Sequence, residues 1–213
     1  IIIANGKPPT KNVVKYFINK GFKTIICADG GANSAKKIKI TPDYIIGDFD
    51  SIMPATVKHF KNNSVVLQYK RQNDTDVEKC LKFALSKKID EVVLFGVTGD
   101  RLDHTICNLG IVIKFFDKIK VHISAENSFL SAFDKSIVIK SKINEIISLY
   151  AFDKKTFISS KGLKYPLTQS NLAFGVKEST SNVATSENVE LKILGGIVFV
   201  VRDFNFMKKY DLF

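Results

Sequence analysis

Two aspartates separated by a single residue follow an apolar segment. Asp48 and Asp50 flank Phe49, just after residues 44–46 and Gly47. Because residues two apart in an extended segment point to the same face, both carboxylates can reach one small volume at the end of a strand. Two like charges that close repel each other unless a proton or a cation intervenes. Mg²⁺ prefers oxygen ligands and commonly arrives with a nucleotide's phosphates, so the pair is a candidate magnesium site; an exposed acidic turn is the alternative.

A pair of glycines follows an earlier apolar segment. Residues 28–33 read Ala-Asp-Gly-Gly-Ala-Asn and precede a helical pattern. Paired glycines let the backbone turn tightly and approach a ligand, and the free N–H groups at a helix N-terminus bind anions. Asp29, Gly30 and Asn33 are therefore candidates for nucleotide binding. The alternative is an ordinary strand–helix turn in which Asp29 caps the helix.

A third polar cluster contains two more aspartates. Thr75 and Glu78 have the spacing of a capping box, which begins a helix. The box leaves Gln72, Asp74 and Asp76 without a structural explanation. Acids in a first helical turn ordinarily interact with the helix dipole. If this cluster lies at the same sheet edge as the first aspartate pair, however, Asp76 completes a plausible cation site.

An arginine opens the last helical pattern of the first half. Arg101 follows a glycine-containing turn and is predicted to lie in the first turn of the helix, beside free N–H groups. That geometry suits a phosphate group. The alternative is an exposed arginine paired with Asp103 or Asp100. The helix is predicted to have one apolar face, made by Leu102, Ile106, Leu109, Ile113 and Phe116.

The elements that position these clusters alternate along the first half. Short apolar runs alternate with amphipathic helical stretches, a pattern typical of a parallel sheet covered by helices. Ligands bind beyond the carboxyl ends of the strands in such sheets, where each polar cluster falls. The predicted strands are residues 1–4, 24–28, 44–46, 65–69 and 92–95, and the predicted helices are residues 12–19, 33–38, 55–61, 76–86 and 101–116.

The helical period disappears after about residue 116. Short strands separated by turn residues follow, a pattern typical of an antiparallel sandwich or barrel. The fold class is therefore α/β plus all-β, with an α/β nucleotide-binding domain at residues 1–118 and a β-sandwich domain at residues 119–213. The strands predicted in the second half are residues 120–124, 129–133, 137–140, 146–152, 156–159, 172–176, 189–194 and 197–202.

The composition limits the classes of function. A net charge of +11 invites a nucleic-acid partner, but only three of the 32 basic residues are arginines and the lysines are dispersed, so we expect a solvated surface. No apolar run approaches the roughly 20 residues that span a bilayer, so we expect no membrane. The odd number of scattered cysteines predicts reduced, buried thiols and a cytoplasmic protein.

Taken together, the ordered blocks resemble the thiamine pyrophosphokinase family. The resemblance rests on residues 28–33, 47–51, 72–76 and 98–104, and it continues in residues 162–167, 172–175 and 179–182. It implies transfer of a diphosphate group from ATP to the hydroxyl of thiamine, giving thiamine diphosphate and AMP. It also implies an α/β nucleotide domain, a β-sandwich domain, and a homodimer with active sites at the subunit interface.

The resemblance also implies roles for individual residues. Asp103 and Asp76 are both candidates for accepting the proton of the hydroxyl. The sequence departs from the family pattern at Asp100, which stands where a second glycine is frequent, and at Tyr165, which stands where some relatives have Trp. By resemblance, Mg²⁺ is held by Asp48, Asp50 and Asp76, the triphosphate and the hydroxyl are surrounded by Gln72, Thr75, Arg101 and Asp103, and the thiamine pocket is lined by Ser179, Ser181 and Asn182.

Three other functions compete with this one. A sugar-nucleotide transferase that binds Mg²⁺ through Asp48 and Asp50 explains one cluster and leaves the second half unexplained. A basic nucleic-acid-binding module explains only the charge. A non-catalytic sensor of thiamine or nucleotide keeps the fold without the reaction. Formation of AMP from ATP only when thiamine is present separates the enzyme from all three.

Overall fold

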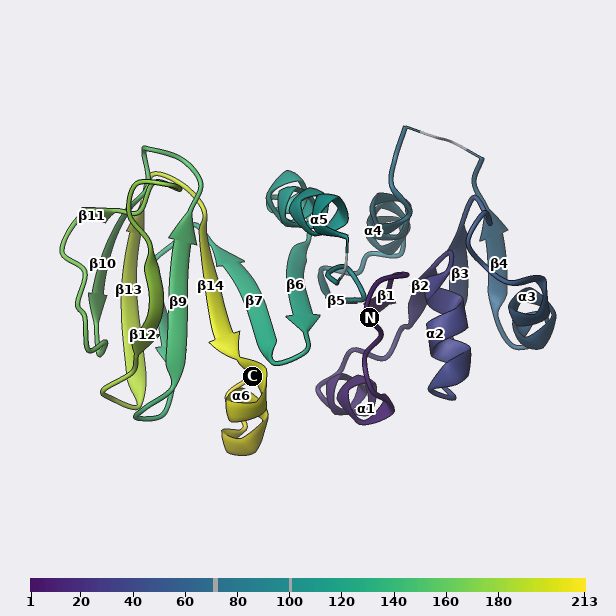
Figure 1. The fold of residues 1–213 in the computed structure, drawn as a ribbon, viewed down its shortest axis with the longest axis horizontal. Helices are drawn as coiled ribbons and strands as arrows, with labels where there is room; N and C mark the ends of the chain where they lie inside the picture. Colours follow the sequence, from purple (N-terminus) through teal and green to yellow (C-terminus); the bar gives the residue numbers. More distant parts are fainter. Residues whose placement is uncertain (71–72, 100) are drawn as a thin grey trace. The chain divides into compact units, whose positions relative to one another are not determined.

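The structure, a computed structural model, describes residues 1–70, 73–99 and 101–213. Its contacts divide the chain into two units, Ile1–Ala125 and Glu126–Phe213. Strands and helices alternate in the first unit, as predicted (Figure 1). In chain order they are β1 (Ile2–Ile3), α1 (Lys11–Asn19), β2 (Ile26–Ala28), α2 (Gly31–Lys37), β3 (Tyr44–Gly47), α3 (Pro54–Phe60), β4 (Val65–Gln68), α4 (Asp76–Ser86), β5 (Glu91–Phe95), α5 (Leu102–Phe115) and β6 (Lys120–Ala125).

The strands of the first unit form a parallel sheet in the order β6–β5–β1–β2–β3–β4. Helices α1, α2 and α3 lie on one face of this sheet, and α4 and α5 lie on the other (Figure 1). Right-handed crossovers require this arrangement, because the chain moves from β1 to β4 in one direction and from β5 to β6 in the other. The strand order reverses between β1 and β5, and in parallel sheets ligands bind at such a point, beyond the carboxyl ends of the strands.

Glycines let the loops at this sheet edge approach one another closely. A Cβ on Gly47, at the end of β3, would lie 2.6 Å from the Cβ of Asp29. A Cβ on Gly6 would lie 2.5 Å from the carbonyl oxygen of Gly96, so the loops after β1 and β5 are in contact. A larger residue at either position would separate the strand ends that carry the polar clusters.

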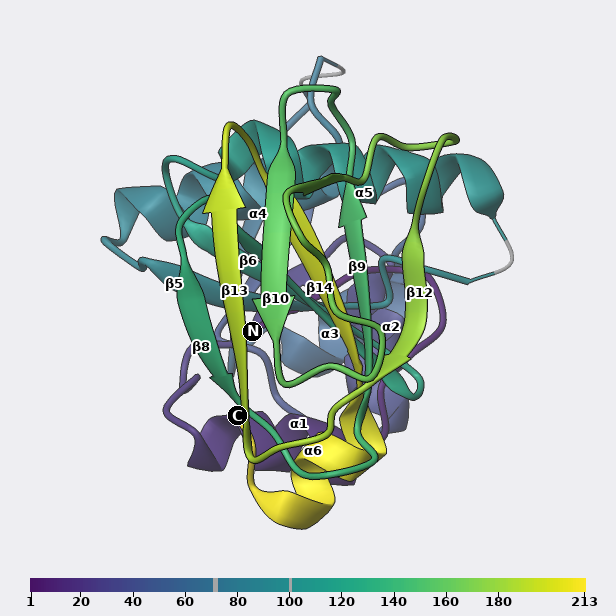
Figure 2. The same cartoon turned by 90° about the vertical axis from the view of Figure 1, so that its left-hand side faces the viewer.

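The second unit contains two antiparallel sheets that share one hydrophobic core. The strand orders are β12–β9–β14–β7 and β11–β10–β13–β8, and Figure 2 shows the two sheets face to face. Ile147 and Leu149 of the first sheet pack in one cluster with Ile158 and Leu191 of the second. The elements are β7 (Ser128–Phe133), β8 (Ile137–Lys140), β9 (Ile146–Ala151), β10 (Phe157–Lys161), β11 (Ser170–Asn171), β12 (Ser179–Val183), β13 (Asn188–Leu194), β14 (Val198–Asp203) and α6 (Phe204–Tyr210).

Several elements of the second half differ from the predictions. Residues 120–124 form a strand, but β6 pairs in parallel with β5 and so belongs to the first unit. The strand predicted at residues 172–176 is wrong: the segment forms a turn, with a single bridge at Ala173, because Gly175 has a φ of +78° and reverses the chain. Strand β12 was missed because its polar side chains do not have the apolar alternation typical of strands. Helix α6 was missed although Asp203 caps it.

The apolar face predicted for α5 is not the face that packs. Leu102 and Ile106 are 70% and 62% exposed, and Ile113 is also exposed. The amide of Asn108 donates to the carbonyl oxygen of Val97, with 2.7 Å between Nδ2 and O, and this bond directs the opposite face of the helix inward. The buried residues of α5 are Asn108, Ile111, Val112 and Phe115.

Two expectations from composition are tested by the structure. Cys27 and Cys80 are free and buried, as predicted, but Cys107 is exposed because it lies on the outward side of α5. Within residues 1–70, 73–99 and 101–213, no helix combines the length and the apolar character needed to cross a membrane.

Candidate active site

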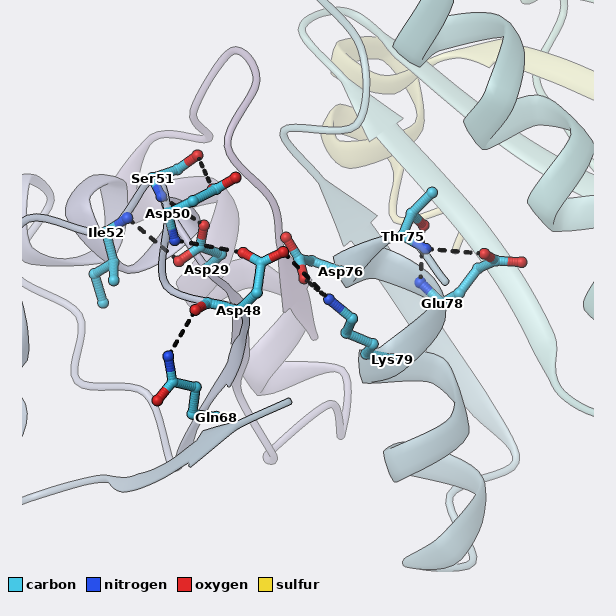
Figure 3. Close-up of polar contacts among 10 residues, drawn as sticks. All are labelled: Asp29, Asp48, Asp50, Ser51, Ile52, Gln68, Thr75, Asp76, Glu78 and Lys79. Carbon is cyan, nitrogen blue, oxygen red and sulfur yellow. Dashed lines mark hydrogen bonds and ion pairs between the residues drawn. The ribbon is translucent and has the colours of Figure 1, made fainter. Parts of the chain in front are cut away.

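Asp29 joins the loops that follow β2 and β3. It lies directly after β2 with a φ of +42°, and its side chain is buried. Its Oδ2 accepts a hydrogen bond from the backbone N–H of Ser51 (2.9 Å) and its Oδ1 accepts one from Ile52 (3.2 Å) (Figure 3). Burial, above all, raises the pKa of Asp29 to about 6. The side chain therefore holds the aspartate-containing loop against β2.

Asp48 and Asp50 occupy a sharp turn centred on Phe49, whose φ is +74°. The backbone N–H of Asp50 donates to Asp48 Oδ1 (3.4 Å), and the hydroxyl of Ser51 donates to Asp50 Oδ1 (2.7 Å). Hydrogen bonding with Ser51, and then with Asp29, lowers the pKa of Asp50. Asp29, Asp48 and Asp50 each place a carboxylate oxygen within 4.8 Å of the others, a donor set that suits Mg²⁺.

Asp76 approaches from the other side of Asp48 (Figure 3). It is the first residue of α4, and its Oδ1 accepts a hydrogen bond from Lys79 Nζ at 2.7 Å. The same ammonium lies 3.7 Å from Asp48 Oδ2. Burial works against the charge of Lys79, but the hydrogen bond to Asp76 and the neighbouring carboxylates outweigh it and raise the pKa of Lys79. Asp76 thus contacts the carboxylate cluster through a lysine that the sequence analysis missed, although its i,i+3 spacing from Asp76 was visible.

The predicted capping box is present at the start of α4. Thr75 Oγ1 accepts from the backbone N–H of Glu78 (3.2 Å), and Glu78 Oε2 accepts from that of Thr75 (3.0 Å). Glu78 also forms an ion pair with Lys114 of α5. The box fixes where α4 begins, and therefore where Asp76 lies.

A cleft of about 740 Å³ is lined by residues from the five loops that follow β1, β2, β3, β4 and β5 at this sheet edge. It brings Asp29, Asp48, Thr75, Asp76, Arg101 and Asp103 together, along with Lys79. Asn33 and Gly30, predicted to contact nucleotide, are not among its lining residues. The Asn33 amide instead donates to Ser51 O and accepts from Met53 N–H, at 3.1 Å each, and a Cβ on Gly30 would lie 2.4 Å from the Asn5 side chain. Gln72 and Asp100 lie outside the described residues.

Arg101 and Asp103 form an exposed pair at the start of α5. Arg101 occupies the N-cap position, and its Nη2 and Nε donate to the two carboxylate oxygens of Asp103 at 2.6 and 3.2 Å. This contact is the alternative that the sequence left open for Arg101. The hydrogen bonds from Arg101, above all, lower the pKa of Asp103 to about 2.

In the second unit, Ser179 and Asn182 line a pocket of about 290 Å³ together with Tyr165. Asn182 is buried, and its amide holds the main chain of Tyr165: Oδ1 accepts from Tyr165 N–H (3.1 Å) and Nδ2 donates to Tyr165 O (2.7 Å). Nδ2 also lies 3.2 Å from Ser179 Oγ. Ser181 lies at an irregularity in the β12–β9 pairing, with a φ of +54°, and is not among the lining residues.

Comparison with known proteins agrees over both units. Residues 17–123 match the model of the thiamin pyrophosphokinase catalytic domain, and residues 135–198 match that of the thiamin pyrophosphokinase vitamin B1 binding domain. Thiamin pyrophosphokinase 1 of Caenorhabditis elegans is 30% identical, over 97% of this chain and 90% of the relative.

Solved structures show the same fold. The thiamine pyrophosphokinase of Bacillus subtilis superposes with a TM-score of 0.82 at 24% identity, covering 95% of this chain and 97% of that one. The enzyme from Candida albicans gives a TM-score of 0.81 at 20% identity, covering 95% and 88%. The order of the polar clusters, the two domain matches and the full-length relative lead to one conclusion: this chain belongs to the thiamin pyrophosphokinase family.

Proposed function

We propose that residues 1–118 bind Mg²⁺ and ATP and that residues 119–213 bind thiamine. The reaction is that of the family: the chain is a transferase that moves the diphosphate group of ATP to the hydroxyl of thiamine, giving thiamine diphosphate and AMP. The observation that carries the assignment of sites is the convergence of Asp48, Asp76 and Arg101 on one cleft at the reversal point of a parallel sheet.

Asp48, Asp50 and Asp76 are proposed to hold Mg²⁺. The carboxylate oxygens of Asp29, Asp48 and Asp50 within 4.8 Å of one another support a site for a hard cation. Mg²⁺ would supply positive charge to the phosphate oxygens as the β-phosphorus is attacked. Asp29 already accepts two backbone N–H groups, so its role in this proposal is to hold the loop that carries Asp48 and Asp50.

Arg101 is proposed to exchange Asp103 for the oxygens of the triphosphate. The exchange is reasonable because the pair is exposed, lines the cleft and lies at the N-terminus of the 14-residue helix α5, where free N–H groups favour anions. The thiamine hydroxyl then attacks the β-phosphorus in line, and AMP leaves. While Arg101 holds Asp103, that carboxylate is a weak base; release of Arg101 restores its basicity, so Asp103 and Asp76 both remain candidates for accepting the proton.

The thiamine site is proposed to include Ser179 and Asn182, which line the pocket, and Ser181, which lies beside them on β12 of a proposed β-sandwich. The core shared by the two antiparallel sheets supports the sandwich. The exposed ring of Tyr165 beside Ser179 and Asn182 supports stacking on the heteroaromatic rings of thiamine. Asn182 contributes by holding Tyr165 in place.

A homodimer is proposed from the outward apolar face of α5. Leu102, Ile106 and Ile113 form an exposed stripe, and soluble proteins seldom leave such stripes uncovered. Ile106→Glu should convert a dimer to a monomer in sedimentation velocity. A wild-type monomer, or an unchanged dimer of the variant, would exclude this face as the interface.

The free cysteines support a cytoplasmic location.

The reaction is tested directly by measuring AMP. The purified chain should form AMP from ATP only when both thiamine and Mg²⁺ are present, with thiamine diphosphate in equal amount. AMP formed without thiamine would indicate simple hydrolysis. Binding of both substrates without AMP would indicate a sensor.

A further inference from the structure

Lys79 is a buried cation inside the proposed magnesium site. Its side chain is 6% exposed, and its ammonium contacts Asp76 at 2.7 Å and Asp48 at 3.7 Å (Figure 3). The lysine lies in the first turns of α4, which is anchored to the sheet by buried Val77, Cys80 and Leu81. Because the helix is held by its core face, the backbone of Lys79 is held in place, and its ammonium lies beside Asp76 and Asp48 in the cleft.

A second lysine of the same helix differs from Lys79 in the exposure of its side chain. Lys82 also pairs with an aspartate, Asp74, at 2.6 Å, but its side chain is 53% exposed. Water screens a charge in that position, whereas a buried ammonium acts on its neighbours through a medium of lower effective dielectric constant. Lys79 therefore influences the carboxylates, and any ion beside them, much more strongly than Lys82 does.

The charge of Lys79 has two consequences for a divalent ion. It neutralises part of the repulsion between Asp48 and Asp76, so these carboxylates stay close when no ion is bound. It also repels a second cation that approaches Asp48, because that cation must share the oxygen atoms with the ammonium. The negative charge of a triphosphate offsets this repulsion. An ion that arrives with the nucleotide is therefore favoured over an ion alone.

We infer that Lys79 is a positioning residue that serves as the resident counter-cation of the site, holding Asp48 and Asp76 together and weakening the binding of a free divalent ion so that the ion binds with the nucleotide. The inference rests on the proposed magnesium site. It assigns Lys79 no contact with the reacting atoms.

The test measures Mn²⁺ binding to the free protein, by electron paramagnetic resonance, without nucleotide or turnover. Lys79→Met should tighten the dissociation constant for Mn²⁺ by about tenfold or more, since it removes the competing charge. Lys79→Arg, which keeps the charge, should stay near wild type. The matched control is Lys82→Met, which removes an equal charge from the same helix and should change Mn²⁺ affinity less than about twofold. Addition of a non-hydrolysable ATP analogue should shrink the difference between Lys79→Met and wild type.

Unchanged or weaker Mn²⁺ binding by Lys79→Met overturns the inference, as does equal tightening by Lys82→Met. Lys79→Gln replaces the methionine variant if circular dichroism shows that the latter does not fold. Asp48→Asn separates this inference from the proposed function. If it leaves Mn²⁺ binding by the wild-type background intact, the magnesium site itself is wrong. If it removes binding while Lys79→Met fails to tighten it, only the role of Lys79 is wrong.

Discussion

The cleft of the first unit and the pocket of the second use their polar residues in opposite ways. In the cleft, among the residues that the structure describes, the carboxylates of Asp48 and Asp76 both lie near the ammonium of one buried lysine, Lys79. In the pocket, the amide of Asn182 is fully engaged by backbone groups and by Ser179. The carboxylates of the cleft could therefore bind a cation, whereas the amide of Asn182 stabilises the backbone that forms the pocket.

This difference shows that a residue's match to a family motif does not by itself establish that the residue contacts a ligand. Asp48 and Asn182 both lie in blocks that resemble the family, but of the two Asp48 alone belongs to a carboxylate group that could hold a metal ion. Asn33 is a similar case in the first unit, because its side-chain amide hydrogen-bonds to two backbone groups of the neighbouring loop. Substitutions in the two regions can test whether the cleft residues act through their charge and the pocket residues through their structural contacts.

The largest effect is expected from the acids that are proposed to hold Mg²⁺. Asp48→Asn, Asp50→Asn and Asp76→Asn should each lower kcat/KM by at least about a hundredfold, equivalent to about 2.7 kcal/mol of transition-state stabilisation. AMP formation measures the loss, and thermal unfolding should show a folded protein. Asp117→Asn is the control, since Asp117 is an exposed acid remote in sequence from the cleft loops. A lowered melting temperature with nearly normal kinetics would show that these acids have a structural role. They would then not differ from Asn182 in function.

Arg101→Lys should be the next most costly change. A lysine cannot reproduce the planar fork that Arg101 now offers to Asp103 and is proposed to offer to phosphate. We expect turnover to fall roughly tenfold or more, about 1.4 kcal/mol. Steady-state kinetics with ATP as the varied substrate gives the measurement. A lysine variant equal to wild type would show that the exposed pair with Asp103 is the whole role of Arg101.

Asn182→Ala tests the role of the pocket in the second unit. The change leaves the partly buried backbone N–H and carbonyl groups of Tyr165 without the Asn182 side chain as their partner, at a cost on the order of 1 kcal/mol. The Michaelis constant for thiamine should rise roughly tenfold while that for ATP stays nearly constant, and the melting temperature should fall. Asn205→Ala, which removes a surface amide pair with Asn127, is the matched control. Equal effects on both substrates would contradict the division of the two sites between the units.

The smallest effect concerns a charge cluster away from the cleft. Glu91 contacts buried His122 (2.9 Å) and Lys120 (2.6 Å), and the hydrogen bond to His122, above all, lowers its pKa from 4.5 to about 2. A lowered folded-state pKa contributes stability that is present above pH 4.5 and lost as the pH falls towards 2.

Glu91→Gln should therefore lower the free energy of unfolding by about 1 kcal/mol at pH 7, once solvent screening of this partly exposed side chain is allowed for. The difference from wild type should narrow as the pH falls through that range. Urea unfolding at several pH values measures it, and activity at pH 7 should be unchanged. A difference that is independent of pH would show that the effect is steric.

Much of the fold could be predicted because the information is local. The capping box at Thr75 needs only residues three apart, and the alternation of buried strands and amphipathic helices is visible in short windows. The predictions failed where distant residues decide the outcome. Strand β12 exists because polar residues pair with β9, and α5 is oriented by the bond from Asn108 to Val97.

For the site, the sequence by itself determined which side chains follow the parallel strands, because residue order and strand periodicity place Asp48, Asp76 and Arg101 in the segments after β3, β4 and β5. It did not determine what those side chains contact. Only the tertiary structure decided that Asp29 holds a loop, that Lys79 lies between Asp48 and Asp76, and that Asn182 is bonded to Tyr165. The physical reason is that hydrogen bonds and ion pairs depend on distances of about 3 Å between segments far apart in the chain, which only the packed fold defines.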